Sequence, residues 1–128
     1  MKRYLTIVIT LMLLGGCDIN ESMRAKAKDG KTGNARALAA KGGCMGCHAA
    51  FNSVYGPAWQ LVGERYNGMP GAREMLMERI EKGSYGRWDH VTEGKRMPPQ
   101  KGALDNEELG IVVDYILSLA KGSAAKAP

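Results

Sequence analysis

Aromatic residues are scarce in this 128-residue chain, making up 6% of it, with a single phenylalanine among them. A core built only from the side chains of such a chain would be thin, so we expect another component to help fill it. Long hydrophobic runs are also lacking, since the longest covers residues 4–14 and is shorter than the roughly 20 residues that span a bilayer. No internal repeat and no stretch of strand-like alternation is present, which excludes repeat proteins and sheet proteins. The length allows one domain.

The first 16 residues have the layout of an export signal. Lys2 and Arg3 precede the apolar run, and small residues precede Cys17 in the segment LLGGC. LGGC resembles the lipobox of bacterial lipoproteins, in which the chain is cut before the cysteine and acyl chains are added to it. We therefore predict a signal peptide over 1–16, a lipidated Cys17 and, from the neighbouring Asp18, anchoring on the periplasmic face of the inner membrane. The alternative is a buried N-terminal helix.

The composition on either side of the predicted domain indicates flexible segments. Residues 17–33 carry several charges and two glycines without apolar periodicity, so we predict a flexible tether there. Residues 122–128 predict a disordered tail, which leaves 34–121 as the folded domain. Removing the signal lowers the formal charge from +5 to +3, which is too small for a strong nucleic-acid footprint.

Four helical patterns lie within the predicted domain and assign it to the all-α class. They cover residues 34–43, 56–66, 71–83 and 105–122. We expect Asn34 to cap the first helix, Pro57 to occupy the first position of the second, and Asp105 and Glu108 to form a capping-box pair in the fourth. Residues 83–103 show no pattern, and a connection of that length in a compact domain is usually functional.

The segment GGCMGCHAAF, residues 42–51, carries the strongest chemical signal. Cys44, Cys47 and His48 form C-x-x-C-H, the attachment pattern of c-type haem, in which both thiols add to porphyrin vinyl groups and the histidine reaches the iron. A zinc site would need more ligands than His90, the one other histidine, supplies. A thioredoxin-like pair would need a βαβ pattern, and a plain disulfide leaves His48 without a role. We therefore predict one covalently attached haem c.

A second axial ligand would fill the other side of the iron, and Met97 is the strongest candidate. It ends the patternless segment in the sequence MPP, whose two prolines stiffen the backbone and favour an extended Met97. Met69, in a short turn, is a weaker candidate, and Met75 and Met77 fit core positions of a helix. His90 offers bis-histidine ligation as an alternative to a solvated loop histidine.

C-x-x-C-H near the start of the domain, GPAW soon after it, MPP late and an amphipathic last helix resemble class I cytochromes c, the short single-haem bacterial electron carriers. The resemblance covers about residues 34–121 and implies a fold of about four helices around one haem. It implies His48 as the proximal ligand and Met97 as the distal ligand. It also implies that the first helix packs on the last through Leu38.

The same resemblance implies further contacts around the cofactor. The Pro57 carbonyl would accept the second ring N–H of His48, which fixes the tautomer of the ring. Arg79, in the segment ERIEKGS, and Trp88 would contact the haem propionates. The chain departs from the family pattern in residues 89–96 (DHVTEGKR), which lengthen the segment after Trp88 beyond that of short relatives and leave the role of Trp88 open.

With both axial positions filled by the protein, the iron is open to electrons and closed to substrates, so we expect a one-electron carrier and no enzyme. The resemblance implies redox protein partners, namely a quinol-cytochrome c reductase and a terminal oxidase or reductase, with no nucleic acid and no small-molecule substrate. Lys41, Lys95, Arg96 and Lys101 flank the ligands and either steer the carrier to an acidic partner or form an ordinary solvated surface. Two alternatives are a fixed haem subunit of a larger respiratory complex and a haem enzyme or sensor with an open iron site.

Overall fold

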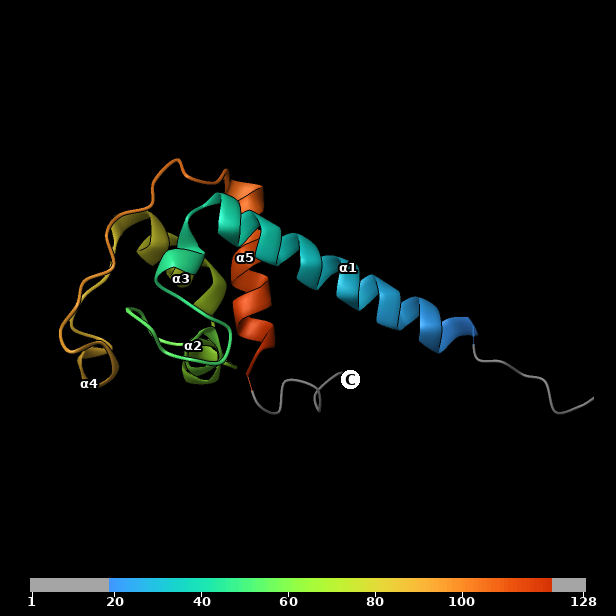
Figure 1. Ribbon diagram of the computed structural model, residues 1–128, viewed down its shortest axis with the longest axis horizontal. Helices are drawn as coiled ribbons and strands as arrows, with labels where there is room; N and C mark the ends of the chain where they lie inside the picture. Colours follow the sequence, from blue (N-terminus) through green and yellow to red (C-terminus); the bar gives the residue numbers. More distant parts are fainter. Residues whose placement is uncertain (1–18, 121–128) are drawn as a thin grey trace, which may run out of the picture. The chain divides into compact units, whose positions relative to one another are not determined.

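The computed structural model describes residues 19–120, and this part of the chain is helical (Figure 1). Its elements are α1 (Ile19–Lys41), the single 3-10 turn η1 (Cys44–Gly46), α2 (Trp59–Tyr66), α3 (Ala72–Lys82), α4 (Asp89–Thr92) and α5 (Asn106–Ser118). Isolated bridges are the only β pairing among these residues, which confirms the all-α prediction. None of the described helices combines the length and the hydrophobicity that crossing a bilayer requires. The predicted signal peptide, Cys17 and the tail over 122–128 lie outside the described residues.

Helix α1 begins earlier than the sequence predicted. We expected a flexible tether over 17–33 and a helix capped by Asn34, whereas the structure has one helix over Ile19–Lys41. The run SMRAKAKD consists mostly of residues with high helix propensity, so it forms a helix although it lacks apolar periodicity. The end of α1 agrees with the prediction, because Gly43 takes up the left-handed conformation that stops it.

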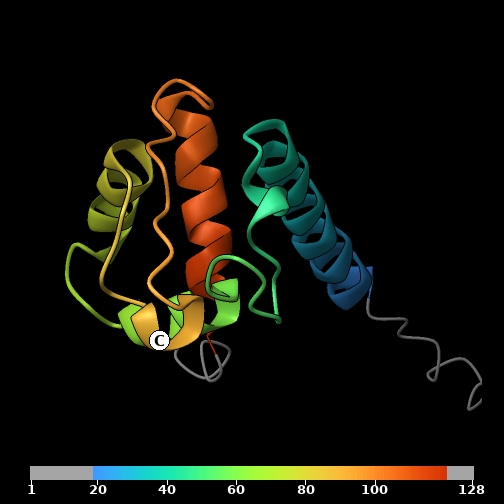
Figure 2. The same ribbon diagram turned by 60° about the vertical axis from the view of Figure 1, so that its left-hand side comes forward.

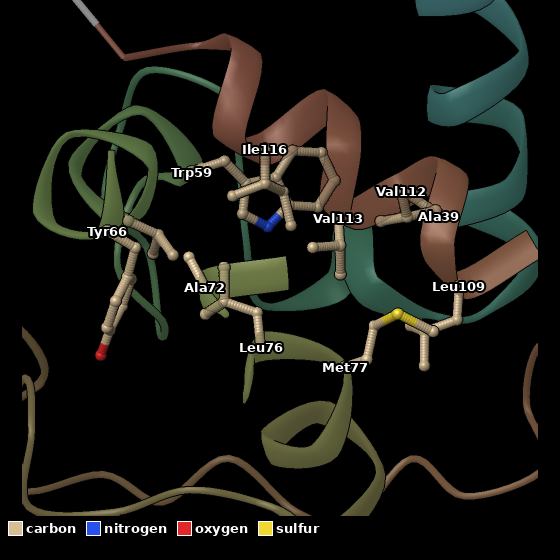
Figure 3. Packing of buried hydrophobic residues seen from close by; sticks show 11 residues of the cluster. Ala39, Trp59, Tyr66, Ala72, Leu76, Met77, Leu109, Val112, Val113 and Ile116 are labelled. Carbon is tan, nitrogen blue, oxygen red and sulfur yellow. The ribbon is translucent and has the colours of Figure 1, made fainter. Parts of the chain in front are cut away.

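Residues 31–120 form one unit, whose core is built around α5. In Figures 1 and 2, α3 runs alongside α5, and α2 lies near the C-terminal end of α5. The α5 side chains in the core are Leu109, Val112, Val113 and Ile116, and they meet Trp59, Val62 and Tyr66 of α2 and Ala72, Leu76 and Met77 of α3 (Figure 3). The backbones of α2 and α5 lie so close that a Cβ added at Gly63 would be 2.4 Å from the carbonyl oxygen of Ile116.

The last turns of α1 contact this core through small side chains. Leu38 packs against the core cluster as expected, although it stays partly buried, and Ala39 is a fully buried member of the same cluster. Ala35, one turn earlier, is buried as well. Alanines at these positions let the helix backbone come close to the core. An ion pair of 2.5 Å between Lys41 Nζ and Glu108 Oε1 joins the end of α1 to the start of α5.

The start of α5 carries the predicted capping box. The carboxylate of Asp105 accepts a hydrogen bond from the backbone N–H of Glu108 at 2.8 Å. The Glu108 carboxylate accepts one from the N–H of Asp105 at 3.1 Å. Two N–H groups that the helix itself leaves unpaired are therefore satisfied, and the prediction for this helix terminus is confirmed.

The long segment after α3 has more structure than the sequence predicted. Within residues 83–103, α4 forms a single turn in which the N–H of Thr92 donates to the carbonyl of Trp88 at 2.8 Å. Further along, the N–H of Met97 donates to the carbonyl of Ser84 at 2.8 Å, and the N–H of Ser84 donates to the carbonyl of Met97 at 3.0 Å. The segment thus folds back beside the end of α3. One turn is too short to produce a periodic sequence pattern.

Candidate functional site

A cavity of about 490 Å³ opens among α2, α3, α5 and the segment that ends at Met97. Its apolar walls include Trp59, Val62, Leu76, Leu109, Val112 and Ile116. The cavity is also lined by Cys44, Cys47 and His48 from one segment and by Met97 from another, so the fold brings the predicted attachment and ligand residues to one place. Pockets for small molecules and cofactors have volumes of about 300–1,000 Å³, and this cavity falls within that range.

The turn η1 places the two cysteines at the cavity. After α1 ends, the N–H groups of Cys47 and His48 both donate to the carbonyl of Cys44, at 3.2 and 3.0 Å. This tight turn directs Cys44, Cys47 and His48 toward one cavity, although two residues separate the cysteines. Cys44 is partly buried and Cys47 is exposed, and no disulfide joins them. Burial raises the pKa of the Cys44 thiol, and this effect is larger than the lowering of the pKa by a backbone hydrogen bond.

The imidazole of His48 is buried and its tautomer is fixed. Its Nδ1 lies 2.8 Å from the carbonyl oxygen of Pro57, and a carbonyl can only accept, so Nδ1 carries the hydrogen. Burial lowers the pKa of His48 more than this hydrogen bond raises it, which favours the neutral ring. The ring stacks on Trp59 with centroids 6.2 Å apart. A neutral imidazole with a hydrogen on Nδ1 leaves the Nε2 lone pair available to a metal.

Pro57 takes part in this arrangement because α2 begins after it. We predicted Pro57 in the first helical position, which is wrong, since Ala58 is extended and the helix starts at Trp59. The N–H of Trp59 donates to the carbonyl of Ala49 at 3.0 Å, so the preceding loop pairs with the helix start. The Pro57 carbonyl is therefore outside the helix and accepts from His48.

Met97 is the methionine that reaches the cavity. Among the methionines from Met45 onward, it alone lines the cavity, whereas Met45 and Met69 are exposed and Met77 is buried in the core. His90 does not line the cavity; it is exposed and stacks on Trp88 with ring centroids 6.0 Å apart. The two candidate distal ligands are thus in different environments.

Arg79 and Trp88, the residues expected to contact the haem propionates, both line the cavity. Arg79 donates a hydrogen bond to the Tyr66 hydroxyl, and its guanidinium lies 5.1 Å from the centroid of that ring. Trp88 carries the Arg65 guanidinium 4.8 Å above its ring. The lengthened segment over 89–96 therefore forms α4 without removing Trp88 from the cavity wall.

Several residues at the cavity carry no signal in the sequence that would have identified them. Tyr55 and Tyr85 line its mouth while remaining 59% and 69% exposed, and Thr92 is buried against it. The tyrosines lie in irregular loops, where no pattern indicates which way a side chain points. Thr92 follows Trp88 by four residues, which places both on one helix face, but this signal is readable only if α4 is known.

The residues at the cavity fit a haem. Paired thiols, a neutral imidazole and a thioether supply the groups that attach a porphyrin and ligate its iron, and the remaining walls are largely apolar. The guanidinium of Arg79 has no carboxylate partner among the residues that the structure describes, so it is available to an acidic group of a bound molecule. These groups are the ones that the covalently attached haem predicted from the C-x-x-C-H pattern would need.

Comparison with known proteins identifies the family, since a model described as cytochrome c matches residues 32–120. The chain belongs to the cytochrome c family. It is 32% identical over 80 residues to cytochrome c2 of Rubrivivax gelatinosus, which covers 62% of this chain and 91% of the relative. It is 32% identical over 113 residues to cytochrome c-551 of Stutzerimonas stutzeri, which covers 88% of this chain and 96% of the relative. The crystal structure of wild-type Nitrosomonas europaea cytochrome c552 is similar, with a TM-score of 0.59 at 30% identity over 66% of this chain and 98% of that one.

These similarities establish a single-haem class I cytochrome c with one covalently attached c-type haem. The predictions of the family, of the all-α fold and of the cofactor are confirmed. Cytochromes c of this kind are haem-containing electron carriers whose partners are redox proteins, and the bacterial members are typically periplasmic.

Proposed function

We propose that this cytochrome is a membrane-tethered one-electron carrier whose haem iron is ligated by His48 and Met97. The observation that carries the proposal is that Met97 lines the same cavity as Cys44, Cys47 and His48. The haem supplies reversible one-electron reduction of its iron. Protein ligands on both sides leave no position for a substrate, so the proposed function is electron transfer without catalysis.

Both proposed ligands are held by their surroundings. The Pro57 carbonyl fixes the His48 ring with Nε2 free, and the stacked Trp59 limits its rotation. Met97 is fixed through its backbone by two hydrogen bonds to Ser84, and Pro98 behind it restricts it further. A thioether is a weak ligand, so a backbone that is already ordered lowers the entropy lost when it ligates.

The cavity walls favour the reduced state of the proposed centre. Methionine ligation raises the reduction potential of a haem. Apolar walls exclude water and disfavour the more highly charged oxidised form. Arg79 and Trp88 are proposed to hold the haem propionates, with Tyr66 keeping Arg79 in place through its hydroxyl.

We propose an oxidase or reductase as electron acceptor and a quinol-cytochrome c reductase as donor. Of the basic residues that flank the ligands, Lys41 is paired with Glu108 and Lys95 with Glu93, which reduces the charge they offer to a partner. Arg96 and Lys101 are exposed and have no carboxylate partner among the described residues, and Arg96 also lines the cavity, so Arg96 is the strongest candidate for steering. Redox encounters bury little area and dissociate quickly, as a carrier needs.

Anchoring through a lipid on Cys17 is supported by the sequence alone. Acyl chains there would hold the chain at the periplasmic face of the membrane, and Asp18 favours the inner membrane. A tether raises the local concentration of a carrier near membrane-bound partners. The residues from Ile19 onward are helical, where the sequence predicted a flexible coil.

Ligand variants test the proposed coordination. The ferric wild type should show the weak long-wavelength band of sulfur ligation, and the ferrous form should resist carbon monoxide. Met97→Ala should remove the band and admit carbon monoxide, while His90→Ala, the matched control, should change neither. The reverse result would overturn the ligand assignment, and carbon monoxide binding by the wild type would favour an enzyme or sensor.

A second experiment separates a carrier from a fixed subunit. Cys17→Ser should move the full-length holoprotein from the membrane fraction to the soluble fraction with an unchanged spectrum. The reduced soluble variant should then be oxidised over many turnovers by membranes that contain a terminal oxidase. Retention on the membrane would contradict lipid anchoring, and oxidation limited to one equivalent per oxidase would favour the fixed-subunit alternative.

A further inference from the structure

Two basic side chains directly before Met97 each lie over a tyrosine ring. Lys95 Nζ is 5.7 Å from the ring centroid of Tyr55, and Arg96 Cζ is 4.6 Å from that of Tyr85. Both distances are within the range in which a cation is attracted to the face of an aromatic ring. Both tyrosines line the cavity, although more than half of each side chain is exposed.

The Lys95–Tyr55 pair joins the two halves of the proposed iron site. Tyr55 lies in the loop between His48 and Pro57, whose carbonyl holds the His48 ring. Lys95 lies in the segment that delivers Met97. A contact between them therefore connects the loop on the side of one proposed ligand to the loop on the side of the other.

The Arg96–Tyr85 pair extends an existing backbone link. The backbones of Ser84 and Met97 exchange two hydrogen bonds as an antiparallel pair. Tyr85 directly follows Ser84, and Arg96 directly precedes Met97, so these two residues form the next pair along. The side-chain pair thus follows the backbone pair at the mouth of the cavity. It strengthens the return of the segment onto the end of α3.

Apart from the two backbone hydrogen bonds between Ser84 and Met97, few contacts hold the segment directly before Met97 closed. Residues 93–96 are exposed, and Glu93 and Gly94 turn the chain in the left-handed region, with φ of 53° and 75°. The Lys95 side chain has one further partner, the Glu93 carboxylate at 3.2 Å, which belongs to the same turn. The backbone N–H of Lys95 donates to the carbonyl of Thr92 at 3.1 Å, which is also a local contact. Segments with few buried contacts open locally at low free-energy cost.

We propose that Tyr55 and Tyr85, through Lys95 and Arg96, are positioning residues that keep the Met97 segment closed and so set how often the iron is exposed to outside ligands. The inference rests on the proposed function, because it takes Met97 as the distal ligand. The two pairs act on the opening of the segment that carries Met97.

The test compares holoprotein variants by imidazole binding to the ferric form and by amide exchange. Tyr55→Leu and Tyr85→Leu should each raise the imidazole binding rate about two- to fivefold, since an exposed cation–π pair contributes that factor to an equilibrium. Hydrogen exchange at the N–H groups of Ser84 and Met97 should accelerate by a similar factor. Tyr55→Phe keeps the ring face and should restore wild-type values in both measurements.

Matched controls separate the pairs from a general effect of surface substitution. Phe51→Leu removes an aromatic ring from the same loop as Tyr55, with 65% of the side chain exposed and no cation over its face among the described residues. Glu93→Gln removes the ion pair of Lys95 and leaves the Tyr55 contact. Both should match the wild type. The inference is overturned if Tyr55→Leu and Tyr85→Leu give the same imidazole binding rate and the same amide exchange as Phe51→Leu.

The same samples distinguish failure of the inference from failure of the proposed function. If the ferric wild type lacks the sulfur band, the assignment of Met97 is wrong and the control of iron exposure fails with it. If the band is present and exchange at Ser84 and Met97 is unchanged by Tyr55→Leu and Tyr85→Leu, the coordination stands and the positioning role is overturned.

Discussion

The Nδ1 atom of His48 lies 2.8 Å from the carbonyl oxygen of Pro57, and Gly56 packs directly against the same ring. The chain thus turns back on itself after the C-x-x-C-H segment and closes around the imidazole. The hydrogen bond selects the tautomer, burial keeps the ring neutral, and the glycine provides the room that the ring occupies. These three effects come from adjacent residues in one loop.

Gly56→Ala should therefore disturb the proposed proximal ligand. A Cβ at this position would lie 2.4 Å from Cε1 of His48, so either the ring or the loop must move. We expect a loss of about 1–3 kcal/mol in the free energy of unfolding of the holoprotein, as for other overpacked positions. Denaturant unfolding followed by haem absorbance measures it. Gly33→Ala, where the added Cβ meets nothing within 4 Å, should be neutral or stabilising, and equal effects of the two would contradict the argument.

Removing the haem should unfold the domain. The double variant Cys44→Ala/Cys47→Ala cannot attach the cofactor, which leaves the cavity of about 490 Å³ within the core. At the cost found for cavities in protein interiors, a void of this size is worth on the order of 10 kcal/mol. The whole stability of a small domain is about 5–15 kcal/mol. Far-UV circular dichroism should show most helix lost, while Met97→Ala, which keeps the haem, should stay folded.

The features of the fold and of the site that could be predicted from the sequence are those defined by residues close together in the chain. The capping box of Asp105 and Glu108 and the C-x-x-C-H segment are each defined by residues within a few positions of one another. The structure contains the capping box as predicted, and it brings Cys44, Cys47 and His48 to one cavity. The helical start of α1 was not predicted, because its residues favour a helix but show no apolar periodicity. Helix propensity without an apolar face is easily mistaken for a charged linker, because sequence reasoning relies mainly on periodicity.

The contacts across the cavity mouth could not be predicted at all. Tyr55 and Lys95 lie 40 positions apart in the chain, in loops whose paths are set by tertiary packing. The position of Pro57 could not be predicted for the same reason. Proline favours the first turn of a helix, but here the helix start pairs with the preceding loop and Pro57 stays outside the helix. That pairing is what frees its carbonyl for His48.

Asp105→Ala should weaken the start of α5. The Asp105 carboxylate satisfies the N–H of Glu108, and loss of such a cap costs about 0.5–2 kcal/mol. Because the side chains of α5 meet those of α2 and α3 in the core, we expect the loss to appear in global unfolding by denaturant. Asn106→Ala, one residue inside the helix, is the control and should change stability by less. A cap variant as stable as this control would show that another group satisfies the N–H.

Glu108→Gln should alter the dependence of stability on pH. The hydrogen bond from the Lys41 ammonium, and then that from the Asp105 N–H, hold the pKa of the Glu108 carboxyl below its ordinary value. A carboxyl whose pKa is lowered on folding stabilises the folded state above its unfolded pKa of about 4.3, and this contribution is lost as pH falls through the folded pKa.

The wild type should therefore lose stability between about pH 5 and pH 3 more steeply than Glu108→Gln, which keeps the capping geometry but not the charge. The difference should be small, since the pair is at the surface, and it should shrink as salt is added. Thermal unfolding across this range, at low and at high ionic strength, measures it. Glu107→Gln removes the same charge from the neighbouring position without touching Lys41, and a pH profile identical to that of Glu108→Gln would show that general charge, and not the link from α1 to α5, determines the acid response.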